Sequence, residues 1–184
     1  MSTKNQSTST MHAHDGLAER IRQSGMLLVR CDMDGEMPSA RRDGDWLSSL
    51  IEQPMIVRTG MRLAAKHWCN RAEPVVCDGI PGLWMIPMPV EERRSRTGYD
   101  VVCVPCDTLL DSEQFRLLCQ AASIDAEYAR DACAALPPTA EADVRRIATL
   151  LRGTWSDNQR CRESEHALEA VSYTHLTLPT ILRV

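Results

Sequence analysis

Runs of apolar residues predict short strands in the first two thirds of this chain. Four runs have the length of strands, and each is bounded by glycine, proline or charged residues. These runs are Met26–Cys31, Pro74–Cys77, Leu83–Pro87 and Tyr99–Val104. The polar stretch Glu91–Gly98 separates the last two runs, so we expect them to pair as an antiparallel hairpin.

Helical spacing of apolar residues is found on both sides of these strands. Asp43, Ser112 and Thr139 each stand where a side-chain oxygen would cap a helix, and Gly153 follows the last helix. The predicted helices are Gly16–Ser24, Asp43–Ile51, Thr59–Cys69, Ser112–Gln120, Ile124–Leu136 and Thr139–Arg152. The last helix has an apolar stripe of Val144, Ile147, Leu150 and Leu151. In contrast, Asp107-Thr-Leu-Leu after the last strand predicts a loop.

A tight turn is expected after the first strand, where the sequence reads Asp32-Met-Asp-Gly35. Asp-Gly is typical of the type I′ hairpin turn, because both central residues of that turn need positive φ. Glu36–Ser39 would then be the returning strand. The same letters, after an apolar strand, open the haloacid-dehalogenase phosphatases, in which the first Asp is the nucleophile beside Mg²⁺.

The spacing of the other motifs weakens this phosphatase alternative. Thr59 and Lys66 would have to supply the later hydroxyl and lysine motifs, but they are too close together. No paired Asp-Asp motif follows a later strand, and Glu36 stands where Thr or Val is usual. We therefore favour the hairpin turn.

The pattern as a whole predicts an α+β fold in four segments. Residues 1–15 are polar and are expected to form a disordered leader. Residues 16–136 would form a small antiparallel sheet with flanking helices, a sensor-like domain of at most PAS/GAF type. Residues 137–170 would be a helical connector, and its charged part, Trp155–Ala170, would be an exit helix suited to a coiled coil. The resemblance described below implies that this connector leads to a missing output domain.

The last segment, residues 171–184, has a different character. Residues 171–180 read Val-Ser-Tyr-Thr-His-Leu-Thr-Leu-Pro-Thr and resemble, codon for codon, the translation of a transposon-type sequencing adapter. A terminal strand is the alternative, because Tyr, Thr and Leu favour strands. We expect these residues to be non-native and the genuine protein to be truncated near Ala170.

Composition and charge narrow the class of protein. The 184 residues contain 43% hydrophobic residues, which is enough for a packed core, and carry a formal net charge of −4. This charge favours neither nucleic acid nor an anionic membrane as a partner. No apolar run has the length of a membrane span or of a secretory signal, so a cytoplasmic location is expected.

Eight cysteines suggest a second kind of chemistry. Cys103-Val-Pro-Cys106 has the spacing of redox dithiols and zinc knuckles, and Cys69 and Cys77 could supply two more thiolates. Without a secretory signal, free cysteines that pack as small apolar side chains are the favoured interpretation. We therefore expect no cofactor, with zinc as the alternative.

Four residues are candidates for contact with a small ligand. Trp68 could stack on a planar ligand beside His67, which titrates near neutral pH, and Trp84 is a second candidate tryptophan. Arg94 belongs to a basic loop that could hold an anion. The favoured interpretation is a Trp68 packed on the sheet, with His67 at the wet edge and Arg94 in a solvated loop.

Several stretches together resemble the amino-terminal regions of large bacterial signalling proteins of the planctomycete kind. They are Gly25–Arg30 with its turn, Trp46-Leu, Gly82–Pro89, Arg93–Tyr99 and Leu109–Cys119. The resemblance implies a non-catalytic sensory region, followed by a GAF-type module and an output domain, often an HD-GYP phosphohydrolase acting on cyclic di-GMP. It further implies a signal passed through the exit helix, and a homodimer formed through that helix.

Overall fold

The computed structural model describes residues 16–17, 19–38, 46–92, 95–134, 139–157, 160 and 164. The predicted leader, the segment 171–184 and most of the predicted exit helix lie outside the described residues. Asp43, Arg94 and the end of the predicted returning strand lie outside them as well.

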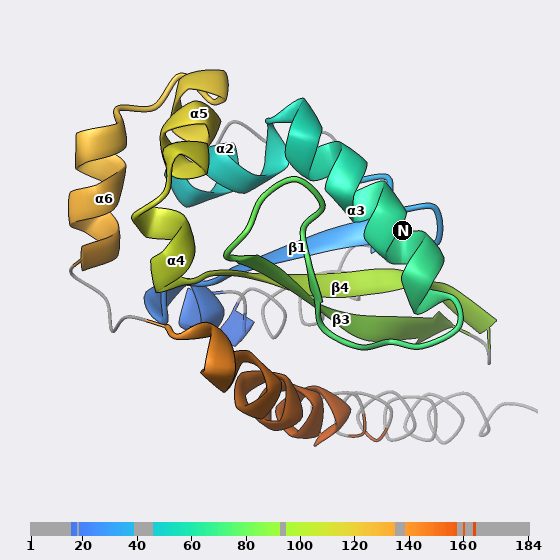
Figure 1. Ribbon diagram of the computed structural model, residues 1–184. Helices are drawn as coiled ribbons and strands as arrows, with labels where there is room; N and C mark the ends of the chain where they lie inside the picture. The colour runs from blue at the N-terminus through green and yellow to red at the C-terminus, as the bar shows by residue number, and fades with distance from the viewer. Residues whose placement is uncertain are drawn as a thin grey trace, which may run out of the picture. The chain divides into compact units, whose positions relative to one another are not determined.

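An antiparallel four-stranded sheet forms the centre of the fold, in the order β1-β4-β3-β2 (Figure 1). The strands are β1 (Leu27–Asp32), β2 (Val75–Val76), β3 (Leu83–Glu92) and β4 (Ser95–Pro105). Strands β3 and β4 form the predicted hairpin, and both continue through the polar stretch between them, where Glu91 lies opposite Arg96. The sheet with its flanking helices confirms the α+β fold class.

One face of the sheet carries the main apolar core. Along β1, Leu27, Val29 and Cys31 lie opposite alternate residues of β4, because side chains alternate between the two faces of a strand. Helices α2 (Trp46–Glu52) and α3 (Met55–Trp68) lie over this face in Figure 1. Their inward side chains, among them Leu50, Ile51, Met61 and Trp68, are fully buried.

The helices that follow β4 are α4 (Asp107–Leu110), α5 (Glu113–Ala121) and α6 (Ala126–Ala134). The predicted cap of α5 is confirmed, because Ser112 Oγ accepts a hydrogen bond from Phe115 N at 3.2 Å. The predicted loop at 107–110 is wrong. Asp107 begins a single helical turn there, and its carboxylate accepts a hydrogen bond from Thr108 N at 2.8 Å.

The chain divides into two compact units between Ala148 and Thr149, inside the segment predicted as the connector. In the first unit, the 3-10 turn η1 (Glu141–Asp143) precedes a helix in which Val144 and Ala148 are buried. In the second unit, residues 149–157, 160 and 164 are helical, so helix continues past the predicted end at Arg152. Leu150 was predicted to face inward but is 62% exposed.

Candidate functional site

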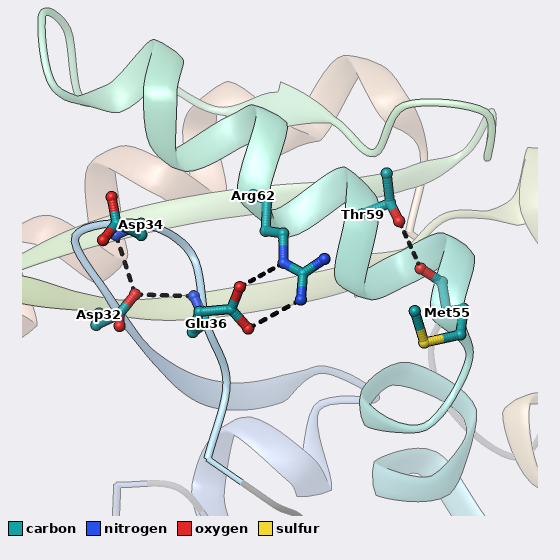
Figure 2. A network of polar contacts seen from close by, with 6 residues as sticks. All are labelled: Asp32, Asp34, Glu36, Met55, Thr59 and Arg62. Atoms are coloured by element: carbon teal, nitrogen blue, oxygen red, sulfur yellow. Dashed lines mark hydrogen bonds and ion pairs between the residues drawn. The ribbon is translucent and has the colours of Figure 1, made fainter.

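The best-defined polar arrangement of the described residues is the turn that follows β1, residues 32–36, which we call the β1 turn. Asp32 Oδ1 accepts hydrogen bonds from the backbone N–H groups of Asp34 at 2.9 Å and Glu36 at 2.8 Å (Figure 2). The backbone of Asp32 also donates to Glu36 O and accepts from Gly35 N, each at 3.1 Å. The carboxylate of Asp32 therefore holds the loop as an Asx turn.

Gly35 is required by this geometry for two reasons. Its φ is +82°, and a Cβ atom at this position would lie 2.7 Å from both Arg62 Cα and Met61 O of α3. Asp34 has no positive φ, so the predicted type I′ turn is wrong, since the side chain of Asp32 sets the geometry instead. Glu36–Pro38 are not in a strand, although the chain does turn back as expected.

An ion pair joins the β1 turn to α3. Arg62 Nε lies 2.5 Å from Glu36 Oε1, and Arg62 Nη2 donates to Glu36 Oε2 at 3.1 Å (Figure 2). A hydrogen bond from Arg62 and the negative charge of Glu36 raise the pKa of the guanidinium. Both side chains are about half exposed, so the pair contributes more to orientation than to stability.

A partly open hollow of about 430 Å³ lies beside the β1 turn, and we call it the turn hollow. Its volume falls within the range of small-molecule sites. Its walls include charged residues from β1 and the turn, and apolar residues from the segment after the turn and from the β3–β4 hairpin. Among them are Arg30, Asp32, Glu36, Met37, Val90 and Tyr99.

A second ion pair fixes one wall of the turn hollow. Arg30 Nε and Nη2 donate to the two carboxylate oxygens of Asp100, each at 2.8 Å. Asp100 is 0% exposed, and Arg30 lies directly opposite it in the β1–β4 register. This two-pronged geometry offsets the cost of burying the carboxylate and holds the guanidinium in one orientation.

No family model, curated protein or solved structure matches the chain. The site therefore has to be interpreted from its own geometry.

The phosphatase alternative gains no support from the positions of its residues. Asp32 sits at the end of β1, but one of its carboxylate oxygens already accepts two backbone hydrogen bonds of the turn. Thr59 and Lys66 both lie on α3, and the Thr59 hydroxyl donates to Met55 O at 2.9 Å within that helix (Figure 2). The structure therefore gives Asp32 and Thr59 local structural roles.

The predicted ligand residues do not form one site. Trp68 is fully buried, donates from Nε1 to Glu73 O at 2.9 Å and packs on the ring of Tyr99 with centroids 5.3 Å apart. His67 is exposed at the end of α3. Trp84 is half-buried and points to the other face of the sheet, because its neighbours Leu83 and Met85 belong to the core under α3. Arg94 lies outside the described residues.

The four cysteines of the zinc alternative do not form one cluster. Cys69 is exposed at the end of α3, and Cys106 immediately precedes α4. Cys77 and Cys103 are buried in the main core with Cys31, and we call these three residues the thiol core. Within the described part of the chain, no group of three or more His, Cys, Asp or Glu residues is placed to hold a metal ion.

Burial makes the thiols of Cys31, Cys77, Cys103 and Cys106 weak acids. Desolvation is the largest cause, and it raises the pKa of Cys31, Cys77 and Cys106 to about 12. The pKa of Cys103 is raised further by the neighbouring Cys77 and Cys31. The Cys103-Val-Pro-Cys106 spacing therefore joins two buried thiols that stay protonated at neutral pH.

Sequence reasoning missed Arg30, Asp100 and Arg62. A signal was present for the first two, because each is a single charge inside an otherwise apolar strand run, and the charges are opposite. Nothing in the sequence links Arg62 to Glu36, since the two are brought together only when α3 packs against the turn.

Proposed function

We propose that this chain is a non-catalytic sensory or regulatory domain that binds a small molecule in the turn hollow. The observation that carries the proposal is the ion pair between Glu36 and Arg62, which ties one wall of the hollow to α3. A ligand that moves Glu36 would change the contacts of a helix that covers the sheet.

The wider setting of this domain is proposed on the resemblance of the sequence alone. A signal would pass from the domain through the carboxy-terminal helix to a GAF-type or HD-GYP output domain of a bacterial protein, and the same helix would join two copies as a homodimer. A cytoplasmic location belongs to the same proposal. Of the described helices, none has both the length and the apolar character of a membrane span.

Hydrogen–deuterium exchange of the full chain tests this proposal. The probes are a panel of small organic cations, anions and neutral molecules at millimolar concentration. We expect at least one probe to slow exchange in the β1 turn and in α3 together. Glu36→Gln should keep the protection of the turn and lose that of α3, because a neutral amide replaces the anionic partner of Arg62. Glu113→Gln is the matched control, since it breaks a Glu–Arg pair on α5 instead.

Two results would contradict the proposal. One is a panel in which no probe protects the β1 turn. The other is robust metal-dependent hydrolysis of cyclic di-GMP or p-nitrophenyl phosphate that Asp32→Asn abolishes, because this would make Asp32 a nucleophile.

A further inference from the structure

We infer that the turn hollow takes a small organic cation with an apolar body, and that the carboxylate of Asp32 is its counterion. This inference rests on the proposed function, and it adds the chemical class of the ligand. Three features carry it: the charge left in the walls, the free side of the Asp32 carboxylate, and the apolar residues around it.

The charges in the walls leave one anion without a cationic partner. Arg30 is matched by the buried carboxylate of Asp100, and Glu36 is matched by Arg62 of α3. Asp32 forms no ion pair with any residue that the structure describes. The described walls therefore carry a net negative charge at Asp32, next to the second carboxylate of Glu36.

The carboxylate of Asp32 is held in place for such contact. Its Oδ1 atom accepts the two turn hydrogen bonds, so the group does not swing freely. Oδ2 accepts no hydrogen bond from the described residues, and Asp32 lines the hollow. A fixed carboxylate binds an ammonium group at a smaller entropic cost than a mobile one.

Apolar walls complete the site. Met37, Pro38 and Val90 line the hollow with apolar side chains. These residues would cover the hydrocarbon part of a ligand, as is usual in small-molecule sites. An anion of the same shape would face the carboxylates of Asp32 and Glu36 without a free cation in the described walls, so the hollow selects against it.

Isothermal titration calorimetry with three probes of one shape tests the inference. The probes are phenethylamine, phenethyl alcohol and phenylacetate, which differ mainly in charge. We expect phenethylamine to bind the full chain about 10-fold or more tightly than the other two, because a hydrogen bond between two charged groups is stronger than one to a neutral group. Asp32→Asn should remove this preference and still fold, since the amide oxygen can accept the two turn hydrogen bonds.

Asp34→Asn is the matched control, because it removes the same charge two residues away, and Figure 2 shows the Asp34 carboxylate directed away from Glu36. Equal loss of amine binding in both variants would reduce the effect to overall charge and overturn the inference. Preferred binding of phenylacetate or of the alcohol in the protected turn would overturn the cation class but leave the proposed function intact. If phenethylamine did not bind at all, the inferred cation class would likewise be overturned.

Discussion

The β1 turn and the thiol core lie next to each other, yet the polar atoms of the turn are exposed and those of the core are buried. In the turn, Asp32 and Glu36 stay exposed, and their charge is directed by backbone N–H groups and by Arg62. In the core, Cys77 and Cys103 are almost completely excluded from water and remain protonated. Both sequences, Asp-x-Asp-Gly and Cys-x-x-Cys, suggested chemistry. Burial distinguishes the two motifs. It keeps the core thiols uncharged, whereas the carboxylates of the turn are exposed to water.

Replacing the turn glycine should have the largest effect. Gly35→Ala adds a Cβ 2.7 Å from backbone atoms of α3 at a positive φ, so we expect a loss of about 3 kcal/mol in the free energy of unfolding. Urea denaturation measures it. Gly16→Ala is the control, because nothing lies within 4 Å of its added Cβ, and an equal loss there would contradict the tight packing of the turn on α3.

The thiol core should respond differently to the same kind of change. In Gly60→Ala the new Cβ would lie 2.4 Å from Cys77 Sγ, so we expect a loss of about 2 kcal/mol. The clash is with a side chain, and Cys77→Ala in the same chain should restore part of this stability. If the two substitutions lowered the free energy of unfolding additively, measured by denaturation, the new Cβ would not be in contact with Cys77 Sγ.

Alkaline pH should destabilise the thiol core and spare the turn. The pKa of Cys77 is raised by burial from 9.0 to about 12, so the unfolded chain loses this proton before the folded chain does. Stability contributed by the neutral thiol is complete below pH 9 and is lost as the pH rises toward 12. Between pH 8 and pH 10 we expect the free energy of unfolding of Cys77→Ala to fall by about 1 kcal/mol less than that of the wild type. Parallel curves for the two proteins would exclude a buried thiol here.

A smaller change is expected at Asp32. Asp32→Ala removes the acceptor of two turn hydrogen bonds and should cost about 1 kcal/mol, whereas Asp32→Asn should lie within about 0.5 kcal/mol of the wild type. Thermal denaturation of the two variants measures the difference. If both were equally destabilised, the charge of Asp32 and not its hydrogen bonding would hold the turn.

The sequence predicts the fold better than it predicts the site. The β3–β4 hairpin and the Ser112 cap follow from local patterns, and both are confirmed. The turn after β1 was located correctly, but its type was not, because the Asp32 side chain replaces a backbone geometry. Arg62 and Glu36 meet only through the packing of α3, and no local pattern encodes such a contact. For Trp68 the residue type allowed a ligand contact, but its place on the apolar stripe of α3 favoured the core, where the structure places it.

The most direct measurement of the central contrast is an NMR titration of the ¹⁵N-labelled chain with phenethylamine. We expect saturable shifts of the backbone amides of Arg30, Asp32, Glu36 and Gly98, with a smaller response at Arg62, and no change at Cys77 or Cys103. Shifts centred on Cys77 and Cys103, or no saturable shift at the β1 turn, would contradict the account.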